Sequence, residues 1–355
     1  MVSPWFRTHQ SLVALAVVCI LGAGGAFLKL QYLGITPGGD YGTYVATAQF
    51  FSHDPNAEVI PYRILKPLNP LLVAALHTFM SYQDAFLLQA LFFYFALAFA
   101  MFALAYEFLE DRFLASCAAL LVILSYPILR YGVDTLTETG AVFFYVLSLW
   151  LTVLFLKVPR VKEFLVNVGV LLLGFLWKEY SAVSAAVLGF AILLHKDLGT
   201  RGKILYLLSY VALFLAVNIP FQIYIFLTYH YTYFSWWFEG GAPLSTACEL
   251  DLHDITKSTA ALLGLAWFAV PFGLWRFRSL PAHMRTFFTF ALPVPFMAFV
   301  WGCVSSRLLY VIAPPFVLIA LWGMKDWKRS YQVIFIAVTL AANIVWLFLS
   351  YSIKL

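Results

Sequence analysis

The sequence predicts an all-α, polytopic transmembrane protein with about eleven spans. Apolar residues make up 63% of its 355 residues and charged residues 11%. Soluble domains are near 45–50% apolar and about 25% charged. Stretches of about 17–25 apolar residues also recur along the chain, each long enough to cross a hydrocarbon layer of about 30 Å. A water-soluble fold could not bury this much apolar surface, so the chain is predicted to be embedded in lipid.

The apolar stretches locate the spans in chain order. The first is too long for the core of a signal peptide, so we interpret it as an uncleaved span. The fifth and sixth are short, which predicts two half-length helices meeting near one membrane face. Residues 1–355 form one transmembrane domain without a separate soluble domain in this interpretation. The predicted spans are 11–33, 84–109, 113–131, 137–157, 164–177, 180–195, 204–228, 258–276, 286–304, 306–324 and 331–351.

Basic residues are unevenly divided between the two sets of connections. One set is cytoplasmic by the positive-inside rule, which places the N-terminus inside and the C-terminus outside. The two longest connections, about 34–83 and 229–257, then lie outside. The sequence contains no Asn-x-Ser/Thr site, which favours a bacterial inner membrane. The basic set comprises Arg7, Arg112, Lys157, Arg160, Lys162, Lys196, Arg201, Lys203, Arg276, Arg278, Arg285, Lys325, Lys328 and Arg329.

Several classes of function are disfavoured. The formal charge of +5 is modest and does not indicate nucleic-acid binding. The short cytoplasmic connections contain no Gly-rich phosphate loop. The four cysteines show neither metal-ligand spacing nor a disulfide framework. Any chemistry is therefore expected on the outer face, with a donor that needs no cytosolic nucleotide.

The first outer loop opens with Gly38-Gly39-Asp40 and continues with apolar residues at helical spacing over 41–51. This pattern predicts a short interfacial helix, and the apolar run 71–80 predicts a second one. Asp40 is suited to cap the first helix, or to act as a general base for an acceptor hydroxyl. Arg63, in the segment Pro61–Pro70, is either an interfacial arginine or a clamp for a phosphate.

Asp134 and Glu138 lie in the outer turn before the fourth predicted span. Thr135-x-x-Glu138 matches a capping box, which is the interpretation we favour for Glu138. Asp134 is not needed for that box and is the better second site carboxylate. Two outer carboxylates could share a divalent metal ion or divide acid and base roles, and the sequence does not choose between these.

Lys178 and Glu179 interrupt an apolar stretch of about 30 residues, where charges are costly and indicate function. They could form a local ion pair at a hinge, or Lys178 could bind a lipid-linked phosphate. Arg307 could likewise end a span or face the same pocket. Aromatics at 236–238 suggest an interfacial belt or a sugar-stacking surface. The acidic cluster Glu249, Asp251, His253 and Asp254 is interpreted as a solvated loop face.

This layout resembles the GT-C superfamily of integral membrane glycosyltransferases. Asp40 in Gly-Gly-Asp-Tyr, Asp134 before the fourth span, Lys178 between two short spans and Arg307 before Pro314 match family positions in order. The segment Pro61–Leu68 resembles the first loop of mannosyltransferase-like members. The chain lacks an Asp-x-Asp in that loop, which leaves a metal cofactor open.

The resemblance implies transfer of a sugar from a polyprenyl-phosphate donor to an acceptor hydroxyl of a lipid, glycan or protein on the non-cytoplasmic face. Asp40 would be the base, and Lys178, Arg307 and Arg63 would bind the donor phosphate. A single, inverting displacement is expected. A cell-envelope polysaccharide polymerase or ligase and a secondary transporter are the alternatives. A transporter is disfavoured because no internal repeat is evident.

Overall fold

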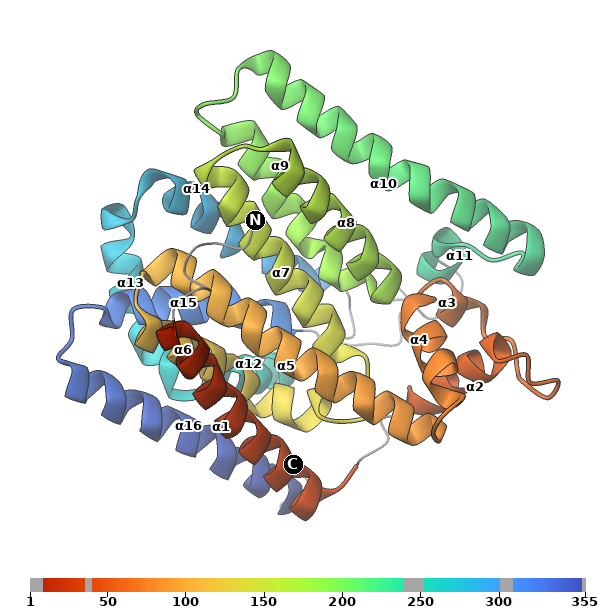
Figure 1. The fold of residues 1–355 in the computed structure, drawn as a ribbon, viewed down its shortest axis with the longest axis horizontal. Helices are drawn as coiled ribbons and strands as arrows, with labels where there is room; N and C mark the ends of the chain where they lie inside the picture. The colour runs from red at the N-terminus through yellow and green to blue at the C-terminus, as the bar shows by residue number, and fades with distance from the viewer. Residues whose placement is uncertain (1–8, 36–39, 239–251, 301–308, 353–355) are drawn as a thin grey trace.

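The computed structural model describes residues 9–35, 40–238, 252–300 and 309–352, and every regular element in these ranges is a helix (Figure 1). Six segments are long and apolar enough to cross a membrane: α1 (His9–Leu33), α5 (Tyr82–Leu109), α7 (Glu138–Lys157), α10 (Thr200–Tyr229), the segment Thr256–Ser279 and α16 (Arg329–Ser352). The all-α, polytopic fold class is therefore confirmed.

The other helices are shorter. They are α2 (Tyr41–Phe51), α3 (Pro61–Ile64), α4 (Leu68–His77), α6 (Arg112–Ile123), η2 (Ile128–Gly132), α8 (Val161–Trp177), η3 (Glu179–Val183), α9 (Ser184–Leu194), α11 (Tyr233–Phe238), α12 (Leu252–Leu263), η4 (Gly264–Ala269), α13 (Val270–Trp275), η5 (Arg276–Ser279), α14 (Ala282–Ala291), η6 (Val294–Val300), η7 (Leu309–Val311) and α15 (Ala313–Met324).

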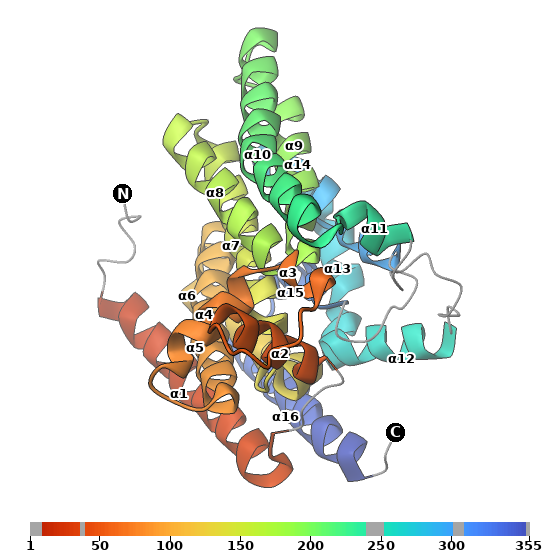
Figure 2. The same ribbon diagram turned by 90° about the vertical axis from the view of Figure 1, so that its right-hand side faces the viewer.

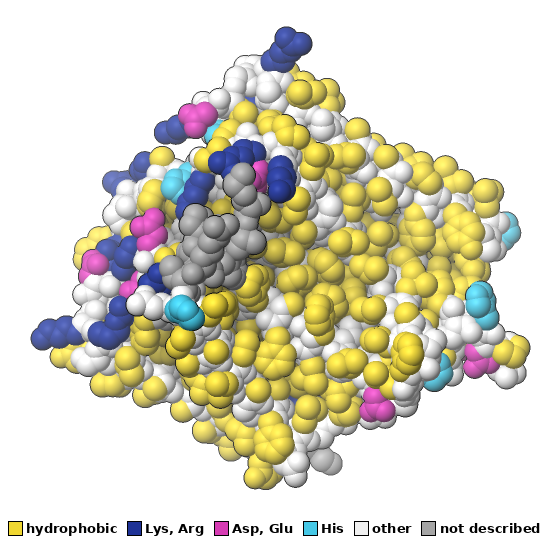
Figure 3. Space-filling view, viewed as in Figure 1, with side chains coloured by type: hydrophobic (Ala, Val, Ile, Leu, Met, Phe, Trp, Pro, Cys, Tyr) yellow, Lys and Arg dark blue, Asp and Glu magenta, His cyan; other side chains and the backbone are white. Residues whose placement is uncertain are grey.

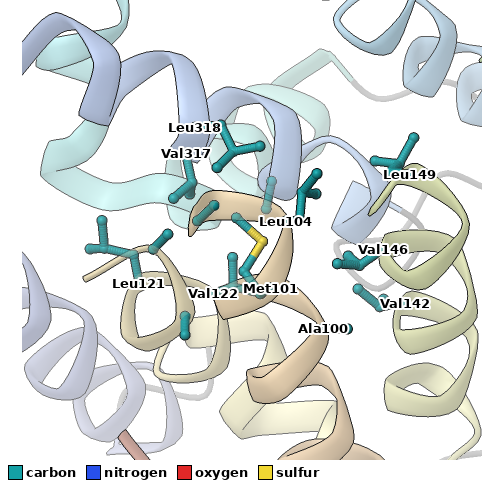
Figure 4. Close-up of a cluster of buried hydrophobic side chains, with 14 of the residues drawn as sticks. Ala100, Met101, Leu104, Leu121, Val122, Val142, Val146, Leu149, Val317 and Leu318 are labelled. Carbon is teal, nitrogen blue, oxygen red and sulfur yellow. The ribbon is translucent and has the colours of Figure 1, made fainter. Parts of the chain in front are cut away.

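The core lies where α5, α6, α7 and α15 meet. Figure 4 shows Met101 of α5, Leu121 of α6, Val146 of α7 and Leu318 of α15 converging there, and all four are buried. Lipid tails are as apolar as these side chains, so close packing rather than exclusion of water holds such helices together. The loop between α1 and α5 packs on this bundle through α4, which contacts α5 and α8.

Proline explains where the helices are shorter than the predicted spans. The predicted span 113–131 is broken, because α6 ends at Ile123 and Pro127 precedes the π-helical η2. The predicted span 286–304 contains the end of α14 and the 3₁₀ helix η6, a break that Pro293 and Pro295 favour. In the predicted span 306–324, α15 begins at Ala313, with proline in its first turn.

The loop between α1 and α5, which we call the first outer loop after its predicted side, has its described residues at one end of the bundle. The predicted interfacial helix 41–51 is α2, and the predicted helix 71–80 is α4, which begins three residues earlier. Between them, α3 lies near α11 (Figures 1 and 2). Lys and Arg side chains gather along the left and upper edges of Figure 3, where the 157–161, 195–200 and 325–329 connections lie. The two ends of the bundle therefore differ in charge.

Candidate functional site

Three ion pairs lie at the end of the bundle opposite the basic edge: one within the first outer loop, one between that loop and η3, and one between α7 and the residue before η3. Each has a nitrogen–oxygen distance of 2.7 Å. The pairs are Arg63–Asp40, Lys66–Glu179 and Lys178–Glu138. We call these six residues the first-loop charge cluster. Opposite charges in a poorly solvated site interact more strongly than in water, so each pair holds its chain segments together.

Asp40 stands at the N-cap position of α2, but its side chain makes no capping hydrogen bond. Its carboxylate instead contacts the Arg63 guanidinium and is 29% exposed. The interpretation of Asp40 as a side-chain cap is therefore wrong. The turn is closed by Thr43, whose hydroxyl donates to the backbone carbonyl of Asp40. This leaves the carboxylate as a partly solvated acid beside a cation.

Arg63 is clamped from several sides and is only 8% exposed, so it is not an interfacial arginine reaching for water. Its Nε donates to Thr43 Oγ1 at 2.9 Å, and its guanidinium lies 4.1 Å from the centre of the Tyr44 ring. Burial by itself would lower the pKa of Arg63, but Tyr44, Asp40 and Tyr62 together raise it above its ordinary value. Arg63 is thus a fixed, permanently charged group that suits an anion.

Asp134 lies in a separate, fully buried ion pair. Its Oδ2 is 2.8 Å from Lys29 Nζ, and the two side chains are 1% and 0% exposed. Lys29 also donates to the carbonyl of Gly34, and the Thr135 N–H donates to Asp134. Asp134 therefore ties the end of α1 to the segment before α7. No group of three His, Cys, Asp or Glu in the described ranges could hold a metal ion.

Glu138 does not complete the predicted capping box. Helix α7 begins at Glu138 itself, and the N-cap residue Thr137 makes no side-chain capping bond. Thr137 is instead held by two neighbours, because the Tyr44 hydroxyl hydrogen-bonds to its hydroxyl and Trp177 Nε1 donates to its carbonyl. Glu138 is fully buried and pairs with Lys178. The ion pair with Lys178 takes the Glu138 side chain away from the predicted capping position, and the local sequence pattern could not reveal this distant partner.

Lys178 and Glu179 break the helix between α8 and η3, as predicted, but they do not pair with each other. Lys178 has extended backbone, with φ of −166°, which sends consecutive side chains to different partners. Lys178 binds Glu138, whereas Glu179 binds Lys66. The local hinge pair is therefore wrong, and the two charges connect α8 and η3 to α7 and to the first outer loop.

Lys66 is the cluster member that was not singled out from the sequence. It is buried, pairs with Glu179 and lies 4.1 Å from the centre of the Trp236 ring. The nearby Tyr233 hydroxyl donates to the carbonyl of Leu65, so α11 packs on the first loop. The signal that could have found Lys66 is a lone lysine between two prolines in the segment Pro61–Pro67.

Two predicted features are not placed. Arg307 lies outside the described residues, as do Glu249 and Asp251. The remaining candidate residues lie at the same end of the bundle and form two groups: the first-loop charge cluster and the Lys29–Asp134 pair. Within the cluster every described cation faces a carboxylate. An incoming anion could therefore bind by displacing a carboxylate from a preformed cation site.

The all-α fold of this chain is similar to that of two solved structures. One is ArnT from Cupriavidus metallidurans bound to undecaprenyl phosphate, with a TM-score of 0.69 and 14% identity over 94% of this chain. The other is the archaeal oligosaccharyltransferase AglB from Archaeoglobus fulgidus, in complex with an inhibitory peptide and a dolichol-phosphate, with a TM-score of 0.57 and 12% identity over 98% of this chain.

The chain matches 64% of the length of ArnT and 55% of that of AglB. The sequence matches no protein-family model and no curated protein. At such low identity the similarity establishes the fold, and the chemistry has to be argued from this chain's own residues.

Proposed function

We propose that this protein is a membrane glycosyltransferase that transfers a sugar from a polyprenyl-phosphate-linked donor to an acceptor hydroxyl on the non-cytoplasmic face. The observation that carries the proposal is the first-loop charge cluster: three buried or nearly buried cations, each held by a carboxylate, on a GT-C fold. Charged groups at membrane depth are costly and are retained for function. Both structural neighbours contain a lipid-linked phosphate, which supports this donor class.

In this mechanism Asp40 is the general base. It takes the proton of the acceptor hydroxyl, the acceptor oxygen bonds to the anomeric carbon, and the bond from that carbon to the donor phosphate breaks. Arg63, Lys178 and Arg307 bind the phosphate as it leaves, and Lys66 joins them as a further cation. Fixed charges in a site that excludes water stabilise such a transition state well. One base and one displacement predict inversion at the anomeric carbon.

Donor binding would also prepare the base. Asp40 is 2.7 Å from Arg63 in the structure, and a carboxylate held by a guanidinium is a weak proton acceptor. A phosphate dianion or diester that draws Arg63 toward itself would release Asp40 for the acceptor. The proposed order is therefore donor first and acceptor second.

The positions of the charged residues support the proposed orientation. Basic residues lie at one end of the bundle and the first-loop charge cluster at the other, so the basic end is proposed to be cytoplasmic, in a bacterial inner membrane. The proposed acceptor is a lipid, glycan or protein hydroxyl. A divalent metal shared by Asp40 and Asp134 does not fit the described residues, because the Asp134 carboxylate is already paired with Lys29. The mechanism therefore has no step on a metal.

The test is sugar transfer by purified protein in lipid, with radiolabelled polyprenyl-phosphate sugars. We expect Asp40→Asn to lower the rate by about 10²–10⁴-fold, the contribution of a general base. Lys178→Met should weaken donor binding. The control is Lys162→Met, which removes an exposed lysine at the basic edge and should leave transfer unchanged. Full transfer by folded Asp40→Asn would refute its role, and no transfer from any donor by wild type would refute the function. A chelator arm tests the metal directly.

A further inference from the structure

A groove of about 450 Å³ lies between α16 and the segment formed by α12 and η4. Figure 2 shows that α12 is oriented across the axis of α16. Its lining combines small residues with aromatic side chains, so an extended apolar chain would fit. The small residues are Ala260, Ala261, Gly264 and Ala342, and the aromatic ones are Trp267, Phe268 and Trp346.

Two polar side chains interrupt this apolar lining. Lys257, half-buried, lines the groove from α12, and Asn343 lines it from α16. Of the described lining residues, Lys257 carries the only charge and Asn343 the only amide. A groove that served only to contact hydrocarbon would need neither group.

The Asn343 amide lacks a hydrogen-bond acceptor. The side chain is 3% exposed, and its Nδ2 has no hydrogen-bond partner among the described residues. Its Oδ1 lies so close to Gly264 that a Cβ there would stand 2.5 Å away, and Gly264 has a positive φ of 53°. A buried donor without a partner costs about 1–3 kcal/mol. A ligand carrying an acceptor would remove this cost.

We propose that the groove binds one anionic glycerophospholipid. Such a lipid offers the three required groups close together: a phosphate for Lys257, an ester carbonyl that accepts from Asn343 Nδ2, and an acyl chain for the apolar lining. A polyprenyl phosphate has a phosphate and a hydrocarbon chain but no carbonyl between them, so it leaves the Asn343 donor unpartnered. The bound lipid braces α16 against η4, and the site is separate from the first-loop charge cluster.

The experiment measures the melting temperature of delipidated protein in an uncharged detergent as each lipid is titrated. Diacyl phosphatidylglycerol is compared with its diether analogue, which lacks only the ester carbonyls, with diacyl phosphatidylcholine and with a polyprenyl phosphate. We expect diacyl phosphatidylglycerol to bind most tightly, about fivefold more tightly than the diether. Asn343→Leu should abolish the ester–ether difference, and Lys257→Gln should abolish the preference for the anionic headgroup.

The matched control is Asn218→Leu, which removes another buried carboxamide, in α10, and should preserve both differences. Ala342→Trp fills the groove and should remove both differences. Equal binding of diacyl and diether phosphatidylglycerol by the wild type would overturn the proposal, as would equal or tighter binding of a polyprenyl phosphate that Ala342→Trp abolishes. The wild-type comparison stays decisive even if a variant fails to fold.

Discussion

The buried Lys29–Asp134 pair offers the sharpest test of how this bundle is held together. Both side chains are almost completely buried, 2.8 Å apart, and Lys29 also donates to the Gly34 carbonyl. Lys29→Met leaves Asp134 as a buried charge without its cation, which costs about 3–5 kcal/mol. Asp134→Leu leaves Lys29 as a buried charge without its carboxylate, at a similar cost in the free energy of unfolding. The double variant buries no uncompensated charge, so it should lie close to wild type.

The assay is the free energy of unfolding in mixed micelles for the wild type, both single variants and the double variant. Single losses of about 3–5 kcal/mol each, with a double variant close to wild type, correspond to a coupling energy of about 6–10 kcal/mol. The exposed pair Arg160–Glu163, 3.5 Å apart, is the matched control, and its coupling should be about 0–1 kcal/mol. Additive losses at Lys29 and Asp134 would refute the reasoning. Sugar transfer retained by the double variant would assign Asp134 a structural role, and transfer lost in a folded double variant would restore it as a site carboxylate.

Other predictions concern close approaches and pH. Gly273→Ala should lower the melting temperature of the protein strongly, because a Cβ there would lie 1.9 Å from the carbonyl oxygen of Ile319. Gly169→Ala is the control and should leave the melting temperature unchanged, because no atom lies within 4 Å of its Cβ position. Equal melting temperatures of the two variants would contradict this prediction. Gly140→Ala should cost about 1–3 kcal/mol, since its Cβ would lie 2.4 Å from the Trp177 ring; an unchanged denaturation midpoint would exclude that clash. Burial, then Lys157, lowers the pKa of His283 below 6.5, so stability should fall as pH drops below about 6.5. His283→Gln should flatten this slope in melting scans, and an unaltered slope would argue against it.

The sequence determined the class of protein because lipid embedding is a matter of composition and length. Apolar stretches long enough to span a bilayer leave little alternative to a helical membrane fold. The helices at 41–51 and near 71–80 followed from the apolar residues of these segments. The break at Lys178 followed from charges within an apolar stretch. These are local properties, and a local pattern is sufficient to predict them.

The partner of each charge was decided by the tertiary structure. The sequence placed Asp40, Asp134, Lys178 and Arg63 at one membrane face, but Lys29 lies 105 residues from Asp134 and Lys66 113 from Glu179. A buried carboxylate is stabilised by whichever cation the fold brings to it, wherever that cation lies in the chain. The local alternatives therefore failed together: the Asp40 cap, the Glu138 capping box and the Lys178–Glu179 pair each lost to an ion pair with a residue elsewhere in the chain. Composition determined that this chain is embedded in a membrane, and helix packing decided which charged residues form ion pairs.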